Sequence, residues 1–152
     1  MAEDAYLDQL NAGQRVRERA RYTTTPGPVG TASTEVVVEV RSHTMPVPPS
    51  VLAEAETARR TCPAFTARSG NNPPIRFNVH AATPPALGQQ SWRVDYHFAA
   101  GSGPIRITGH SSFLIVRVGH NLVTLYVTAI REPIDEKLVT KMVRAAVTAL
   151  DT

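Results

Sequence analysis

Apolar and polar residues alternate almost without a break from residue 91 to residue 129, which predicts several antiparallel strands. Segments 91–99 and 104–118 are expected to form a hairpin, and a tight turn at residues 119–121 leads into a last strand. The last two strands are apolar on both faces, so they should lie in the centre of the sheet.

The register of this hairpin decides which side chains lie together. Its apolar faces match when Phe98 opposes Ile105 and Tyr96 opposes Ile107, next to Trp92 and Phe113 on the same face. On the polar face this register predicts three cross-strand pairs: His97 with Arg106, Asp95 with Thr108, and Arg93 with His110. One face would therefore belong to the core, and the other would carry charge.

Shorter patterns predict the remaining elements. Arginines at every second position over residues 15–21 indicate a strand with one basic face, although a helix is also compatible with them. Alternating valines predict a strand over residues 35–41, and helical spacing predicts a helix over residues 49–61 with Val51, Ala55, Ala58 and Cys62 on its buried stripe. The other expected elements are a short helix in the first eleven residues, a strand at 75–80, and a helix at 134–150 with a stripe of Leu138, Met142, Ala145 and Ala149.

These elements predict an α+β fold, namely an antiparallel sheet of five to six strands with two main helices packed on one face. The 152 residues and the hydrophobic content of 42% suit one domain with its own core. We expect residues 1–33 to form an N-terminal helix, a basic strand and a linker, and residues 34–152 to form a single α+β domain.

Composition excludes some classes of protein. No run approaches the ~18 apolar residues of a membrane span, and the first residues lack the basic and apolar regions of a signal peptide. A formal net charge of +3 is too small to indicate a nucleic-acid partner.

The residues that usually carry chemistry form no known motif. The five histidines lack HxH or HExxH spacing, and the single cysteine, Cys62, has no CxxC partner and sits on an apolar stripe, so we predict no metal site and an inert thiol. The glycines form no phosphate-binding loop, so we predict no cofactor and assign no catalytic residue.

The polar face of the sheet is the best candidate for a binding site, because it combines charged side chains with an apolar patch. The candidate ligand-binding residues are Arg76, His80, Arg93, Asp95, His97, Arg106 and His110. The apolar patch on the same face is predicted to consist of Leu114, Val116 and Val118, with Leu122 and Tyr126. This patch either forms part of a ligand groove or is covered by the N-terminal helix or by the helix that ends at Cys62.

Three short motifs follow one another in an order that resembles a known family. They are Ala58-Arg59-Arg60-Thr61-Cys62-Pro63-Ala64-Phe65, Pro84-Pro85-Ala86-Leu87-Gly88 and Leu114-Ile115-Val116-Arg117-Val118-Gly119. Over residues 34–150 the chain resembles the PknH-like extracellular sensor domains of actinobacterial receptor Ser/Thr kinases and their lipoprotein relatives. In that family a helix ending in a cysteine segment precedes a strand, a PALGD-like loop, an RVG-containing strand, a final strand and a closing helix.

The resemblance implies an antiparallel sheet with packed helices, a cleft for a ligand or partner, an extracytoplasmic location and no known catalytic activity. The chain departs from the family at two positions. The kinase sensors use paired cysteines as disulfides, whereas Cys62 has no partner, and Gln89 follows Gly88 where an acidic residue is expected. We expect an extracytoplasmic location if the sequence is a piece of a longer protein, and a cytoplasmic location otherwise.

Three hypotheses follow. The first is a non-enzymatic, sensor-like domain of an actinobacterial envelope protein that binds a small molecule or peptide, in which replacing Arg93 and His97 by Ala abolishes binding and leaves the fold intact. The second is a small cytoplasmic enzyme or pathway accessory protein with a cavity between sheet and helix, and with Asp95 or a histidine as general base. The third is an interaction module that forms a homodimer through Leu114, Val116 and Val118. In every case a membrane contact would need an anchor outside this sequence.

Overall fold

The computed structural model describes residues 12–23, 32–68, 70, 73–101, 103 and 106–150. The helix predicted for the first eleven residues lies outside this part of the chain. The strands and helices are β1 (Gln14–Thr23), β2 (Ser33–His43), α2 (Ser50–Thr61), β3 (Ala64–Ala67), β4 (Ile75–Ala81), β5 (Gln90–Ala100), β6 (Ile107–Val118), β7 (Asn121–Ile130) and α3 (Glu136–Thr148).

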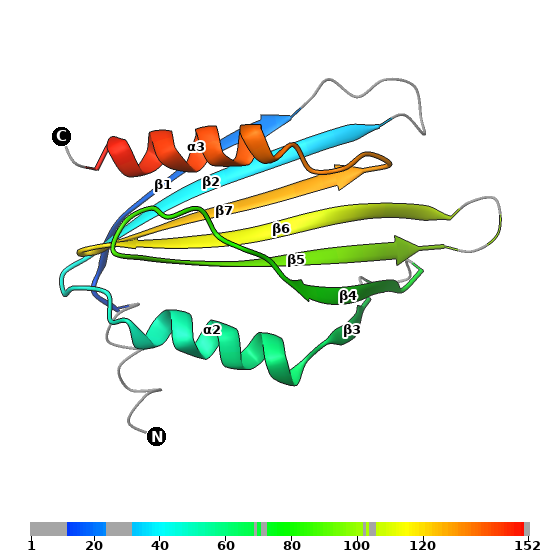
Figure 1. Ribbon diagram of the computed structural model, residues 1–152, viewed down its shortest axis with the longest axis horizontal. Helices are drawn as coiled ribbons and strands as arrows, with labels where there is room; N and C mark the ends of the chain where they lie inside the picture. Colours follow the sequence, from blue (N-terminus) through cyan, green and yellow to red (C-terminus); the bar gives the residue numbers. More distant parts are fainter. Residues whose placement is uncertain are drawn as a thin grey trace.

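The strands form one antiparallel sheet in the order β1-β2-β7-β6-β5-β4-β3 (Figure 1). The α+β class is confirmed, and β6 and β7 lie in the interior of the sheet as their apolar faces predict. The sheet has seven strands instead of five to six. The fold also contains the short strand β3, whose four exposed residues give too brief a pattern to be recognised.

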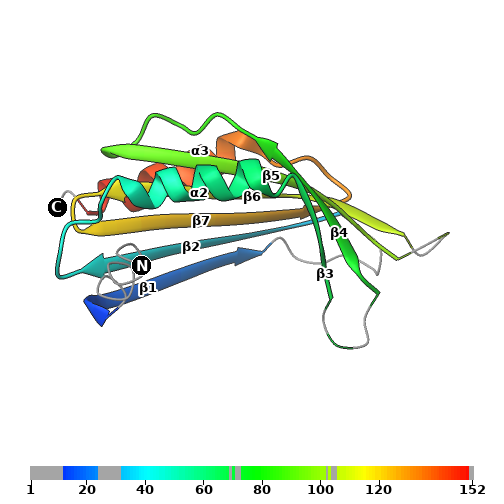
Figure 2. The ribbon, with the colours of Figure 1, turned by 90° about the horizontal axis from the view of Figure 1, so that it is seen from below.

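The two helices lie on opposite faces of the sheet, so the prediction that both pack on one face is wrong. Leu114 and Val116 of β6 pack with α3, whereas Ile115 between them packs with the segment around α2. Neighbouring residues of a strand point to opposite faces, which places one helix on each side (Figures 1 and 2). Because β6 and β7 are apolar on both faces, each face needs a cover. We call these surfaces the α3 face and the α2 face.

The larger core lies under α3. It is formed by valines and leucines of β2, β6 and β7 against Val139, Val143 and Val147 of the helix. The predicted helix stripe is therefore displaced, since Leu138 and Met142 are only partly buried at its margin.

The predicted dimer interface belongs to this core. Leu114 and Val116 are fully buried and Val118 packs beside them, so α3 covers these residues and they cannot form an exposed contact surface. Leu122 and Tyr126 pair with Arg117 and Phe113, which places them on the α2 face and not in the apolar patch assigned to them.

The β5–β6 hairpin has a different register from the predicted one. On one face, Phe98 pairs with Gly109 and Tyr96 with Ser111. On the other face, His97 pairs with His110, Asp95 with Ser112 and Arg93 with Leu114. A Cβ added to Gly109 would lie 2.4 Å from the Phe98 ring and 2.5 Å from the carbonyl oxygen of Ala129. The ring of Phe98 therefore occupies space that only glycine leaves open, and this fixes the pairing.

The predicted boundary at residue 33 stays a prediction. Strand β1, as expected for residues 15–21, pairs with β2 from Gln14 to Thr23 and so continues the same sheet. Its side chains from Arg15 onward are exposed.

Candidate functional site

Six of the seven predicted binding residues lie on the α3 face of β4, β5 and β6. Strand pairing aligns Arg76 and His80 of β4 with Arg93, Asp95 and His97 of β5 and with His110 of β6. Arg106 is exposed and precedes β6. The side chains of these seven residues divide into a buried network around Arg93 and a more open surface of three histidines and two arginines.

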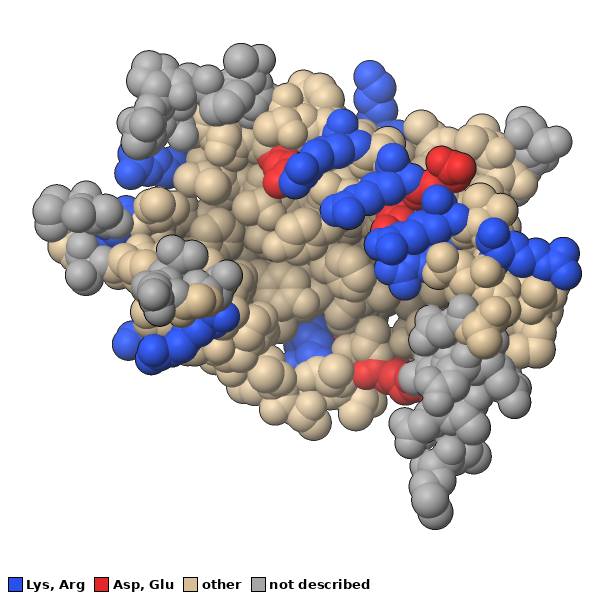
Figure 3. Space-filling view, turned by 180° about the vertical axis from the view of Figure 1, so that it is seen from behind, with Lys and Arg blue, Asp and Glu red and all other residues tan. Residues whose placement is uncertain are grey.

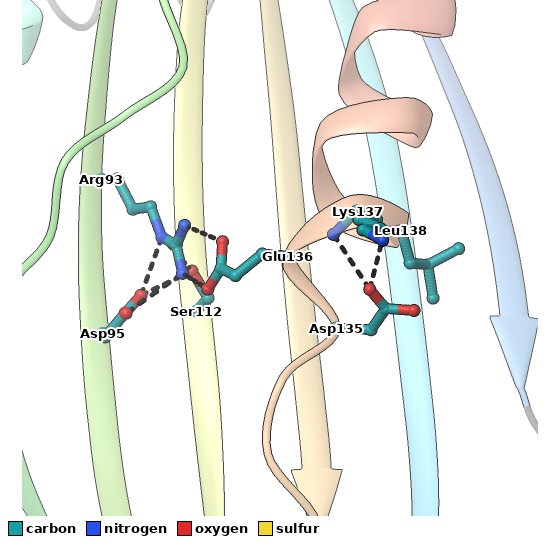
Figure 4. A network of polar contacts seen from close by, with 7 residues as sticks. All are labelled: Arg93, Asp95, Ser112, Asp135, Glu136, Lys137 and Leu138. Atoms are coloured by element: carbon teal, nitrogen blue, oxygen red, sulfur yellow. Dashed lines mark hydrogen bonds and ion pairs between the residues drawn. The ribbon is translucent and has the colours of Figure 1, made fainter.

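Arg93 is the centre of the buried network (Figure 4). Its side chain is 6% exposed, and it donates to both carboxylate oxygens of Asp95 and to both of Glu136 at 2.6–3.1 Å. It also donates to the hydroxyl of Ser112, which in turn donates to Asp95 at 2.7 Å. These bonds involve all three guanidinium nitrogens and four of the five N–H groups, and the side chain is buried, so Arg93 is poorly placed to bind a ligand.

The network joins α3 to the sheet. Glu136 is the first residue of the helix, and Asp135 caps it by accepting from the backbone N–H groups of Lys137 and Leu138 (Figure 4). The hydrogen bonds that Arg93 donates to Glu136, with a further contribution from Asp95, raise the pKa of Arg93 despite its burial. The guanidinium therefore stays charged at every accessible pH, and both Arg93 and Asp95 have a structural role.

Three histidines lie side by side next to this network, one on each of three neighbouring strands. The ring centroids of His80 and His97 are 4.5 Å apart, and those of His97 and His110 are also 4.5 Å apart. We call this row the histidine ladder. Two shallow hollows of about 190 and 290 Å³ open beside His110, towards the segment that leads into α3.

The charge state of the ladder depends on its own members. The pKa of His97 is lowered by partial burial and by the neighbouring rings of His110 and His80. The negative charge of Asp95 partly opposes this effect. The central imidazole is therefore mostly neutral at neutral pH. Since each protonated ring repels the next, the ladder gains charge readily only when a negative group lies against it.

Two arginines carry positive charge next to the ladder. Arg76 and Arg106 line a hollow of about 680 Å³, together with Ala99, Pro73 and Pro74. Ala99 is two residues from His97 on β5, so the hollow adjoins the ladder. Among the described residues, no group of three histidine, cysteine or acidic side chains has the geometry to hold a metal ion.

The α2 face carries a separate cavity of about 270 Å³ between α2 and the sheet. Ala55, Ala58, Tyr96 and Phe113 are among its lining residues, and Cys62 lies at its margin. The thiol of Cys62 is exposed, so the prediction that it is buried in the helix stripe is wrong.

Sequence reasoning missed three residues that position these sites. Ser112 and Glu136 complete the Arg93 network, and Glu56 of α2 accepts a hydrogen bond from the indole N–H of Trp92 at 3.0 Å. Glu136 carried one usable signal, since an acidic residue directly after an N-cap aspartate marks a helix start. Its partner on β5 could not be inferred from spacing.

Comparison of the chain with protein-family models, with curated proteins and with solved structures found no match. Within the described part of the chain, neither helix has the length and hydrophobicity needed to cross a membrane. The described residues thus form an α+β domain in which one antiparallel sheet lies between α2 and α3, and the functional assignment depends on the residues of this domain.

Proposed function

We propose that the chain is a non-enzymatic, sensor-like domain that binds a small anionic ligand at the histidine ladder. The observation that carries this proposal is the row of three imidazoles at 4.5 Å spacing, which α3 leaves uncovered. Arg76 and Arg106 add permanent positive charge beside the row, further along the strands. A carboxylate or phosphate placed there would meet several N–H donors and would favour protonation of the ladder.

Several charged groups face the ladder and set its selectivity. Asp95 is neutralised by Arg93, and Glu136 forms its ion pair with the same guanidinium. Arg131 and Glu132 line the hollow beside His110. Asp95 and Glu136 are therefore already paired with Arg93, which supports an anionic ligand over a cationic one.

The order of the elements supports the sensor-like part of the proposal. The chain has a helix ending near Cys62, then strands, the Pro84–Gly88 loop, the strand containing Arg117 and a closing helix, as in the family it resembles.

Contacts between two of the resembling motifs explain one departure from the family. The backbone N–H of Gln89 donates to Arg117 O at 2.9 Å, and Gln89 Oε1 accepts from the Gly119 N–H at 2.8 Å. A carboxylate at position 89 could accept the same bond, so glutamine preserves this contact.

An enzyme that uses Asp95 as general base is less well supported. Both carboxylate oxygens of Asp95 already accept hydrogen bonds from Arg93, and one also accepts from Ser112. A base must be able to take a proton, and this ion pair opposes protonation. The extracytoplasmic, envelope-associated location rests on the resemblance and is tested by fractionating cells that produce the native protein.

The binding proposal is tested by calorimetry with sulfate, which keeps its charge between pH 5.5 and pH 7.5. Because an anion bound at the ladder favours protonation of the imidazoles, affinity should be about tenfold higher at pH 5.5 than at pH 7.5. His97→Gln and Arg76→Gln should each weaken binding, whereas His120→Gln, in the β6–β7 turn, should leave it unchanged. Equal affinity at both pH values, or equal binding by the His97 and His120 variants, would exclude the ladder as the site.

A further inference from the structure

The α2 face has a second feature that the histidine ladder does not use. Figure 3 shows this face hollowed in its centre, with α2 below the hollow and basic side chains gathered above it, towards the β1 edge. The two ends of the sheet bend towards this side (Figure 2), so the α2 face is concave.

The floor of the hollow is largely apolar along one line across the sheet. Strand pairing aligns Arg21 of β1 with Val37, Tyr126, Phe113 and finally Val94 of β5. Tyr126 is 41% exposed, which is unusual for a large aromatic side chain on an interior strand. The line runs from a cationic edge to the cavity under α2, because Phe113 and Val94 also line that cavity.

The cavity at the inner end is largely apolar and opens to solvent, and Arg59 of α2 also lines it. Its volume is about 270 Å³, and aromatic residues of β3, β5 and β6 form much of its wall. It exists because α2 presents the small side chains of Ala55 and Ala58 to the sheet there. Larger residues at these two positions would fill it.

The outer end is cationic. Strand pairing places Arg17, Arg19 and Arg21 of β1 on the α2 face, next to Arg41 of β2. Glu39 forms ion pairs with Arg17 and Arg41, and Glu35 forms one with Arg21. Four arginines therefore face two carboxylates, and this rim keeps a positive excess.

We propose that this surface, the α2 groove, binds a long-chain carboxylate. The acyl chain lies over Tyr126 and enters the cavity beside Phe113, and the carboxylate meets the arginine rim at Arg19 and Arg21. From β1 to β5 there are four strand spacings, or about 19 Å, which matches an extended long acyl chain. Charge complementarity selects the anionic end, and the largely apolar cavity selects the chain.

The test uses palmitate below its micellar concentration and follows the fluorescence of Trp92, the single tryptophan, which lines the cavity. Binding should saturate at one palmitate per chain. Octanoate should bind at least about a hundredfold more weakly because it buries fewer methylene groups. Hexadecyltrimethylammonium has the same chain length and a cationic head. It should bind at least about tenfold more weakly than palmitate.

Two sets of variants locate the site. Arg19→Glu with Arg21→Glu should weaken palmitate binding at least about tenfold, whereas Arg76→Glu with Arg106→Glu, on the other face, should not change it. Ala58→Phe should abolish binding by filling the cavity that Ala58 lines, and Ala53→Phe, which lies outside the cavity lining, should not.

Equal binding of the cationic amphiphile, many palmitates per chain, or unchanged affinity of the Arg19/Arg21 variant would each overturn the proposal. If Ala58→Phe fails to fold, the exposed arginine pair still decides the question. The proposal is independent of the histidine ladder, because the two sites lie on opposite faces and the Arg76/Arg106 variant affects only the ladder.

Discussion

Replacing Arg93 by alanine should strongly destabilise the fold, contrary to the sequence-based expectation that it would only abolish binding. The guanidinium is 6% exposed and holds Asp95, which is 28% exposed, and Glu136, which is 61% exposed. Charged hydrogen bonds to a mostly buried partner contribute about 1.5–3 kcal/mol, and a solvated pair contributes about 0.5 kcal/mol. With the lost packing of the aliphatic stem, we expect Arg93→Ala to cost about 3–4 kcal/mol.

Urea unfolding followed by circular dichroism measures this loss. For a slope of about 2 kcal/mol per molar urea, the midpoint should fall by about 1.5–2 M. Asp95→Asn should cost about 1–2 kcal/mol and Glu136→Gln less than about 1 kcal/mol, since water can replace the partner of an exposed carboxylate. Arg60→Ala removes an ion pair from an arginine that is 72% exposed and serves as the control, with an expected loss below about 0.5 kcal/mol. A loss below about 1 kcal/mol for Arg93→Ala would refute this account of the network.

Three further predictions concern the ladder and the core. Because the pKa of His97 is lowered in the folded state, its contribution to stability is present above the unfolded pKa of about 6.5 and is lost as the pH falls through the folded value. His97→Gln should therefore flatten the decline of urea midpoints between pH 7 and pH 5, and an equally steep decline would contradict this reasoning. Gly109→Ala should cost about 2–3 kcal/mol in urea unfolding through its clash with the Phe98 ring, and an unchanged midpoint would show that the strands can move apart. Val116→Asp should lower the free energy of unfolding by about 4 kcal/mol or more, because it places a charge under α3. The variant should therefore unfold instead of changing its oligomeric state, and a circular dichroism spectrum of a folded variant would contradict this.

The periodic patterns predicted most strands and both long helices, but they could not fix the pairing of β5 with β6. The predicted register, with Phe98 opposite Ile105, differs from the observed one by four residues. An even shift keeps each side chain on its face, so the face of His97 was predicted correctly while its partner was not. The register depends on how Phe98 packs over Gly109, and a hydrophobic pattern does not contain that information.

The position of the helices was wrong for a related reason. The sequence contains the evidence that β6 and β7 are apolar on both faces, and two apolar faces require two covers. Periodicity does not show which helix reaches which face. For the candidate site, residue type correctly predicted which face of the sheet the charged residues occupy. It could not predict the bonds between Arg93 and Glu136, because these residues are 43 positions apart in the sequence. Such a contact decides whether a charged side chain binds ligand or holds the fold.

The exposed arginines of β1 have a consequence for association between molecules. An uncovered edge strand offers backbone N–H and C=O groups to any second strand, which is a common route to aggregation. Two copies that paired through β1 in antiparallel fashion would bring their rows of arginines close together on the same face. This repulsion is screened over about 10 Å at 0.1 M salt, so colloidal stability should be greatest in dilute buffer and should decrease as salt is added.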